Sequence, residues 1–198
     1  MSARERILAR IRDALEDRPK AAHPGRFRGE RPTPPLPPAE GFAQLFTKAG
    51  GEVVRVPDEA GAAAWLRDFT TGVDGVSVGA GVDKSLFPNG ATAQPERAEV
   101  GISLARGAVA ETGSLLLDSR DGRRTQLLPP THVVVLDAAS IHATLVETLT
   151  DLRQDLPTAV GLHSGPSKSA DIGQILVKGV HGPGRVIALI VDAAPSPP

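Results

Sequence analysis

Apolar residues recur along this chain at two spacings, which predict alternating helices and strands. Residues 39–49 and 59–69 carry apolar side chains at helical spacing, with Phe42 and Phe46 on one face of the first segment. Between and after them, the short apolar runs at 52–56 and 76–79 are typical of strands. Alternation of this kind with short connections predicts a parallel sheet of the α/β type.

The second half of the chain continues the pattern with longer apolar runs. Residues 115–117 and 132–136 predict strands that are buried on both faces, and Asp121-Gly122 marks a turn between them. The remaining predicted elements are a helix over 140–154, a strand over 159–162, a helix over 170–177 and a strand over 186–191. All of these strands are expected to join one sheet, so we predict a three-layer, mostly parallel α/β domain.

The first 38 residues have a different character from the rest. Residues 2–17 predict an amphipathic helix with Ser2 as its N-cap. Seven prolines between residues 19 and 38 exclude a regular helix or central strand and favour an extended linker. The expected organisation is an N-terminal helix over 1–18, a proline-rich linker over 19–38 and an α/β domain over 39–193.

Composition narrows the possible partners and cofactors. A net charge of −1 gives no general attraction to nucleic acid or anionic lipid. Cysteine is absent, which excludes disulfides and cysteine-ligated iron–sulfur clusters, and we expect no cofactor in this chain. Charged residues follow Met1, and the apolar run at 186–191 is too short to span a bilayer, so we expect a cytoplasmic protein without a membrane span.

Two loops in the last third, residues 164–171 and 179–184, are dense in glycine, proline and small polar residues. Such loops allow close backbone approach to a ligand, and the start of the helix expected at 170 would favour an anion. The predicted ligand-binding residues of this loop pair are Ser164, Gly165, Ser167, Lys168, Ser169, Asp171 and Gly182. The alternative is that Ser167 or Ser169 only caps the helix, while Asp171 stabilises its first turn.

Acid–base chemistry has two main candidates. His181 stands between Val180 and Gly182 in a loop, which suits a general acid or base. Glu111 opens the 115–117 strand and suits a base or a covalent acyl carrier; alternatively it only accepts backbone hydrogen bonds there. His132 begins an apolar strand and is more typical of a hydrogen-bonded histidine at a strand end.

Known nucleotide and metal motifs are not matched. Gly79-Ala80-Gly81 follows a strand, but Lys84 stands where the dinucleotide-binding fingerprint requires its last glycine. Residues 165–169 lack the spacing of a phosphate-binding Walker loop. No pair of histidines has the spacing of a metal-binding motif, so no metal site is predicted.

Four motifs occur here in the order seen in one family. They are AETGSL at 110–115, LLPPTH at 127–132, SGPSKSADI at 164–172 and GVHGPG at 179–184. On these motifs the chain resembles the lactate utilization protein C family, which consists of a single lactate-utilization (LUD) domain. The resemblance implies a fold like that of the sugar-isomerase and CoA-transferase-like group, and adds Thr112 and Gly113 to the expected ligand-binding residues.

The resemblance also implies a process, the oxidation of L-lactate to pyruvate alongside iron–sulfur proteins. Our leading hypothesis is therefore a non-redox component of a cytoplasmic lactate-oxidation system, with a small anionic metabolite and iron–sulfur proteins as partners. The alternatives are a stand-alone acyl-CoA transferase or sugar-phosphate isomerase-like enzyme that uses Glu111 and His181, and a metabolite-sensing module.

Overall fold

The structure is a computed structural model that describes residues 2–16, 36–88, 91–92, 94–170 and 176–192. It divides into two compact units, residues 1–32 and residues 33–198. The first unit contains helix α1 (Ala3–Glu16), none of whose residues is buried. Ser2 begins it as expected: its hydroxyl accepts a hydrogen bond from the Glu5 amide at 3.2 Å, and the Glu5 carboxylate accepts one from the Ser2 amide at 2.6 Å.

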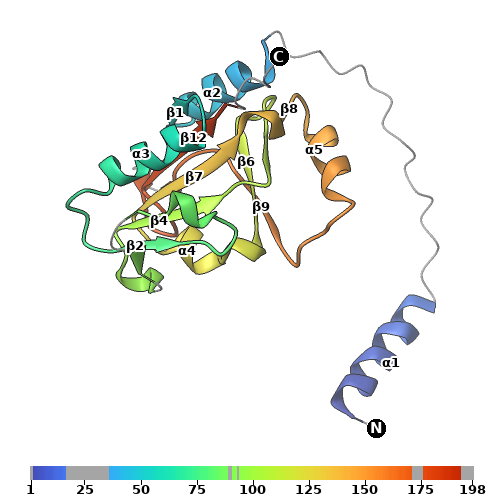
Figure 1. Cartoon of the computed structure of the whole chain (residues 1–198). Coiled ribbons are helices and arrows are strands. Elements are labelled where there is room, and N and C mark those ends of the chain that lie inside the picture. The colour runs from blue at the N-terminus through green and yellow to red at the C-terminus, as the bar shows by residue number, and fades with distance from the viewer. Residues whose placement is uncertain (1, 17–35, 89–90, 93, 171–175, 193–198) are drawn as a thin grey trace. The chain divides into compact units, whose positions relative to one another are not determined.

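A parallel sheet forms the centre of the second unit (Figure 1). In spatial order its described strands are β1 (Glu52–Val56), β12 (Arg185–Val191), β7 (Thr131–Asp137), β4 (Val100–Leu104), β2 (Val76–Val78) and β3 (Ala91–Thr92). Every neighbouring pair among them is parallel. The expected α/β class with a mostly parallel central sheet is therefore confirmed.

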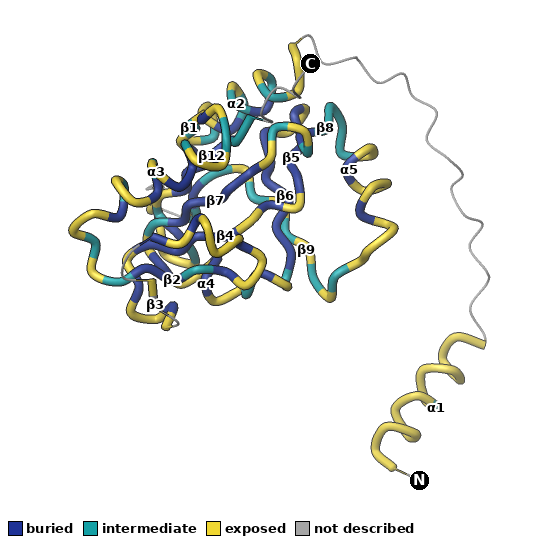
Figure 2. The backbone as a smooth tube through the Cα atoms, in the orientation of Figure 1, coloured by how far each residue is buried: buried dark blue, intermediate teal, exposed yellow. Residues whose placement is uncertain are grey.

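The two faces of this sheet bury different sets of side chains. Helix α3 (Glu59–Phe69) covers one face, where Val133 and Val135 of β7 join its apolar cluster. Helix α2 (Pro38–Lys48) covers the other, where Val134 and Leu136 pack with Phe42 and Phe46. Alternate residues of one strand thus point into opposite clusters, which is why β7 and β12 are apolar almost throughout and dark blue in Figure 2.

A second sheet shares the α2 face, and this corrects the expectation of a single sheet. Its described strands, in order, are β8 (Ile141–His142), β5 (Gly107–Val109), β6 (Ser114–Asp118) and β9 (Val160–His163). Strand β6 is antiparallel to both β5 and β9. Since only four residues separate β5 from β6, they form a hairpin, and Gly113 at φ 60° makes the return possible.

Two predicted helices are wrong in extent or in type. The helix expected over 140–154 is shorter: the helix α5 covers only Leu145–Leu152. The residues before it form η4 (Ala138–Ser140) and the strand β8. Thr144 and Glu147 form a capping box, which fixes the start of α5. Instead of a helix over 170–177, the structure has the antiparallel pair β10 (Lys168–Ala170) and β11 (Leu176–Lys178). Ser169 pairs with Val177 in this ladder, so it does not cap a helix.

Short helices connect the remaining strands. They are η1 (Lys84–Leu86), η2 (Pro95–Arg97), η3 (Ser119–Asp121) and α4 (Arg123–Leu127). Helix α4 lies so close to β4 that a Cβ atom on Gly101 would be 2.2 Å from the Thr125 carbonyl oxygen. The turn expected at Asp121-Gly122 is thus the passage from η3 to α4, and it places Asp121 in the interior at 4% exposure.

Candidate functional site

The two glycine- and proline-rich loops meet at one cavity of about 260 Å³. It is lined by Leu127, His132, Leu162, His163, Ser164, Gly165, Pro166, Ser167, His181, Gly182, Pro183 and Val186. Among these described residues are three histidines and no carboxylate, and we call the space the histidine cavity. Five of the predicted ligand-binding or catalytic residues line it, namely Ser164, Gly165, Ser167, His181 and Gly182.

Backbone hydrogen bonds hold these loops at the amino ends of two central strands. The Ser167 amide donates to the Pro183 carbonyl at 2.9 Å, and the Gly179 amide donates to the Ser167 carbonyl at 3.0 Å. The Gly184 amide donates to the carbonyl of Pro130, immediately before β7, at 3.0 Å. The loops are therefore fixed to each other and to the start of the sheet.

A row of hydroxyl groups reaches the cavity from the β5–β6 turn. The Thr112 and Ser114 hydroxyl oxygens are 2.8 Å apart, and those of Ser114 and Ser164 are 2.6 Å apart. Ser114 is buried, while Ser164 lines the cavity. The AETGSL motif thus contacts the cavity wall through Ser114, while Thr112 and Gly113 are not among the residues that line the cavity.

His132 is the most deeply buried polar group of the cavity, at 1% exposure. Its Nε2 atom is 2.7 Å from the Ser103 hydroxyl, while its Nδ1 atom is buried without a hydrogen-bond partner. Burial, together with the nearby His163, lowers the pKa of His132 to about 3. Burial also lowers the pKa of His163, so both imidazoles are neutral at pH 7.

A buried carboxylate, that of Asp121, belongs to the same region as Ser103. Asp121 accepts hydrogen bonds from the amides of Gly81, at 2.6 Å, and Leu104, at 2.5 Å. Burial raises the pKa of Asp121, but the two amides and the Ser103 hydroxyl oppose that shift by stabilising the charged form. The Gly79-Ala80-Gly81 segment therefore surrounds this carboxylate: a Cβ atom on Gly79 would be 2.3 Å from Asp121 Oδ1.

The other predicted site residues have different surroundings. Glu111 is exposed, and its Oε1 accepts the Leu145 amide at 2.7 Å at the start of α5, which matches the alternative role of a backbone acceptor. Lys168 donates from Nζ to the Ala49 carbonyl after α2 and is not among the residues lining the cavity. Ser169 lies in β10, and Asp171 lies outside the described residues.

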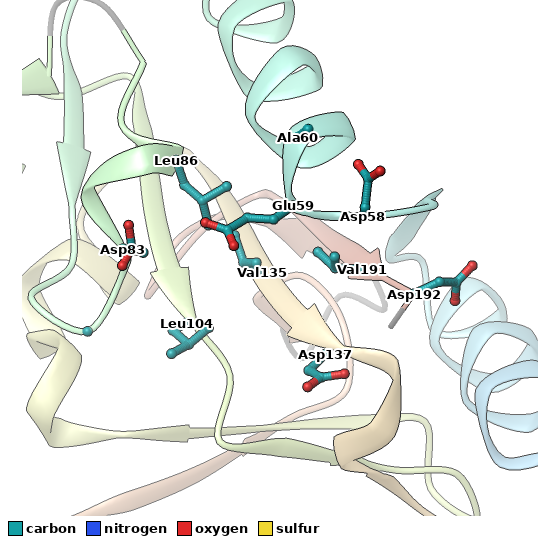
Figure 3. A pocket seen from close by; sticks show the side chains of 11 residues that line it. Asp58, Glu59, Ala60, Asp83, Leu86, Leu104, Val135, Asp137, Val191 and Asp192 are labelled. Atoms are coloured by element: carbon teal, nitrogen blue, oxygen red, sulfur yellow. The ribbon is translucent and has the colours of Figure 1, made fainter. Parts of the chain in front are cut away.

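A second and larger cavity, of about 600 Å³, lies at the opposite edge of the sheet and was not anticipated from the sequence. Figure 3 shows the carboxylates around it, which are Asp58, Glu59, Asp83, Asp137 and Asp192. Each already accepts a hydrogen bond from a neighbouring group. We call it the acidic cavity; its position beyond the carboxyl ends of β4, β7 and β12 is the usual ligand position in parallel sheets.

The described part of the chain contains neither a group of metal ligands nor a helix that could span a membrane. No three histidine, aspartate or glutamate side chains are grouped there so that they could hold a metal ion, even though three histidines line one cavity. Within the same residues, no helix is both long and apolar enough to cross a lipid bilayer.

Sequence reasoning missed Ser103 and Asp121. They lie 18 positions apart, in β4 and η3, and no local pattern relates them to the LLPPTH motif that contains His132. The available signal was a serine inside an otherwise apolar strand, because a buried hydroxyl needs a hydrogen-bond partner.

Comparisons with known proteins agree with the fold. A crystal structure of a DUF162 family protein from Deinococcus radiodurans superposes with a TM-score of 0.61 and 22% identity. The match covers 79% of this chain and 99% of that one, and it supports the arrangement of the elements.

Curated relatives match at the level of sequence. The lactate utilization protein C of Macrococcus caseolyticus is 36% identical over 105 residues, which are 49% of this chain and 46% of that protein. The lactate utilization protein C of Bacillus subtilis is 36% identical over 105 residues, 49% of this chain and 44% of that protein. The chain thus spans a little under half the length of these relatives.

The family model described as the LUD domain matches residues 89–191, slightly more than half of the 198 residues. This range contains all four motifs on which the resemblance was based, together with Ser103, Asp121 and every residue that lines the histidine cavity. The chain belongs to the LUD domain family.

Proposed function

We propose that this protein takes part in lactate utilization in the cytoplasm, as a non-redox component that acts with iron–sulfur proteins. The observation that supports the process is the likeness to relatives named lactate utilization protein C. The chain has no cysteine to ligate an iron–sulfur cluster, so any such cluster would belong to a partner.

The histidine cavity would be the binding site for a small anionic metabolite. What supports this is its construction: two loops, remote along the chain from the hydroxyl row of Thr112 and Ser114, contribute Ser164, Ser167 and His181 to one space. Hydroxyl and imidazole groups are hydrogen-bond donors for a carboxylate, and no described carboxylate in the wall would repel it. The acidic cavity has the opposite character and disfavours an anion.

His181 would be the group that meets the anion at the mouth of the cavity. It is exposed, it comes from the GVHGPG loop, and Gly182 beside it leaves the backbone accessible. An imidazole can donate a hydrogen bond to a carboxylate, and it can act as an acid or a base toward a bound ligand.

The process is tested by deleting the gene in the organism that encodes it and measuring growth on L-lactate as sole carbon source. We expect growth to be lost, and to be restored by the wild-type gene but not by the Ser164→Ala/His181→Ala double variant. His142→Ala is the matched control, because His142 is outside the histidine cavity. Normal growth of the deletion strain on L-lactate would overturn the proposed process.

The partners are tested separately by affinity purification of the tagged protein under anaerobic conditions. We expect proteins with stoichiometric iron and acid-labile sulfide to co-purify with it. If the protein is recovered alone in cells grown on L-lactate, the proposed complex does not exist.

A further inference from the structure

Strand β9 is the last described strand of the second sheet, and one of its edges is unpaired. The Ser119 amide donates to the Ala159 carbonyl at 3.0 Å, in register with the pairing of β6 and β9. In an antiparallel pair, successive residues alternate between bonding to the partner strand and pointing away from it. The backbone groups of Gly161 therefore bond to β6, whereas those of Val160 and Leu162 point away. Among the described residues, none forms a backbone hydrogen bond with them.

Strand β9 lacks the residues that usually protect such an edge. Exposed edges are guarded by charged residues, proline or bulges, because their unpaired N–H and C=O groups recruit other strands. The strand, Val160–His163, contains no lysine, arginine, carboxylate or proline. The side chains of Val160 and Leu162 are 40% and 47% exposed. It thus offers backbone hydrogen bonds and apolar contacts to one more strand.

A groove follows this edge. Leu162 and His163 line the histidine cavity, while Val160 and Gly161 line a cavity of about 130 Å³. Leu127 of α4 and His163 line both, so we call the two together the β9 groove. Successive strand residues point to opposite faces of a sheet, and cavities lined by all four therefore follow the edge of β9.

The polar groups that the β9 groove exposes favour negative charge. Arg123 is exposed at its smaller cavity and has no ion pair with a described residue. At the other end, the exposed imidazole of His181 can donate to a carboxylate. The carboxylate described in the wall is that of Asp118, which is 5% exposed, with its Oδ2 3.6 Å from Arg106 Nε. A segment that carries carboxylates therefore complements the groove.

We infer that the β9 groove is a docking site for an extended, acidic segment of another protein, which adds a strand beside β9. The outward N–H and C=O groups of Val160 and Leu162 bond to its backbone, and Leu127 contacts its apolar side chains. Arg123 and His181 bind its carboxylates. The inference goes beyond the proposed function, because it concerns a protein partner and not the metabolite.

Charge argues against a second copy of this chain as the occupant. A two-fold pairing of β9 with itself about Gly161 would place Val160 of one copy opposite Leu162 of the other. Arg123 at one end of the groove would then approach His181 of the other copy, and neither copy would supply an accessible carboxylate from the described wall.

The open edge is tested first without any partner, by amide hydrogen exchange of the full chain followed by NMR. We expect β6 to protect the amides of Gly161 and His163, and the amides of Val160 and Leu162 to exchange at least about tenfold faster. Equal protection of all four amides would overturn the inference, because the edge would then already be paired.

Binding is tested with peptides selected from a displayed library of random octapeptides on the immobilised full chain. We expect the enriched peptides to alternate apolar and acidic residues, and the best of them, made synthetically, to protect the amides of Val160 and Leu162. Replacing its acidic residues with lysine should weaken binding at least about tenfold. Absence of enrichment, protection elsewhere or equal affinity of the lysine peptide would each overturn the inference.

Leu162→Pro and Leu162→Val form a matched pair of variants. Proline removes an outward N–H that β6 does not use, and it is tolerated on edge strands, whereas valine keeps that N–H. We expect the proline variant to bind the selected peptide at least about tenfold more weakly, and the valine variant within about twofold of wild type. Equal affinities in a folded proline variant would overturn the inference.

Arg123→Gln keeps the test decisive if the proline variant does not fold, because Arg123 is exposed and outside β9. It should weaken the acidic peptide several-fold and leave an all-glutamine version unchanged. An unchanged affinity for the acidic peptide would overturn the charge match. Sedimentation of the wild-type protein covers the rival occupant: a dimer that the proline variant dissociates would assign the edge to a second copy. If no peptide binds while growth on L-lactate still requires the gene, the proposed function survives and the docking site does not.

Discussion

The hydroxyl oxygens of Ser114 and Ser164 lie 2.6 Å apart, although 50 positions separate the two residues along the chain. Ser114 is the first residue of β6 and Ser164 directly follows β9, so the contact closes the end of an antiparallel strand pair. Ser164 also lines the histidine cavity. The position of the SGPSKSADI loop is therefore coupled to the second sheet as well as to the central one.

This coupling predicts a measurable interaction energy. Ser114→Ala and Ser164→Ala should each lower the free energy of unfolding by about 1 kcal/mol, because each removes one partner of a part-buried hydrogen bond. The double variant should lose less than the sum, by about 0.5–1 kcal/mol, in urea denaturation. Strictly additive losses would show that the two hydroxyls do not bond to each other in solution.

Close packing of α4 on β4 makes a second prediction. Gly101→Ala would bring a Cβ atom to 2.2 Å from the Thr125 carbonyl oxygen, and backbone cannot move aside as a side chain can. We expect a loss of about 3 kcal/mol or more in unfolding free energy, since overpacking against rigid structure forces the backbone to shift.

Gly41→Ala is the control for this substitution. Gly41 lies within α2, and its added Cβ atom would have ordinary contacts at 3.6 Å from Ala110 and 3.9 Å from Leu36. Alanine is the better helix former, so the expected effect is neutral or a gain of up to about 1 kcal/mol. Comparable losses in both variants would contradict the close approach of α4 to β4.

The sequence was most informative where the apolar pattern is local. Residues 52–56 and 59–69 were predicted with the bounds that β1 and α3 have, because each element's own periodicity and flanking polar residues define it. The two-sheet arrangement was not predicted. A run such as Leu115–Leu117 is equally apolar in a parallel or an antiparallel sheet, and strand partners are chosen by distant residues.

The site could be predicted in part for the same physical reason. The two loops are recognisable in the sequence by their glycine and proline content, and five of their predicted residues line one cavity. The helix expected over 170–177 was wrong, because the strands β10 and β11 form by pairing with each other. The spacing of apolar residues along one segment carries no information about such pairing. The partner of His132 could not be predicted, because Ser103 lies 29 positions away along the chain and approaches it only through tertiary folding.

The N-terminal unit should be dispensable for the folding of the rest. Helix α1 buries no residue, and Ile7, Leu8, Ile11 and Leu15 are 59%, 38%, 49% and 54% exposed. Removing residues 1–32 should leave a single cooperative thermal transition within a few degrees of the full chain. The cut spares Pro37, whose carbonyl accepts the Gly41 amide at the start of α2. An aggregated or non-cooperative product would show that the domain needs this unit.

Purified protein should contain no iron–sulfur cluster of its own. Cysteine thiolates are the usual ligands of such clusters, and the sequence has none. We expect a colourless sample whose iron, measured by elemental analysis after chelator treatment, is far below one atom per chain. Stoichiometric iron with visible absorbance in such a sample would point to histidine and carboxylate ligands instead.

His132 should make the protein sensitive to acid. Its pKa is lowered to about 3 in the folded state, whereas an unfolded histidine titrates near 6.5. Between these values the unfolded chain binds one more proton than the native one, so the free energy of unfolding falls as the pH falls. The expected loss from this group alone is about 2 kcal/mol between pH 7 and pH 5, where each pH unit below 6.5 removes about 1.4 kcal/mol.

Urea denaturation at several pH values, repeated on His132→Gln, isolates this contribution. Burial raises the pKa of Asp121, so above pH 3.8 this group lowers the free energy of unfolding as the pH rises. Asp121 is present in both proteins, so its contribution cancels in the comparison. His163, whose pKa is also lowered by burial, adds to the loss in both. The variant should therefore lose about 2 kcal/mol less than the wild type between pH 7 and pH 5. Parallel pH profiles for the two proteins would mean that His132 is protonated in the native state near its ordinary pKa, and that it is not sealed in the interior beside Ser103.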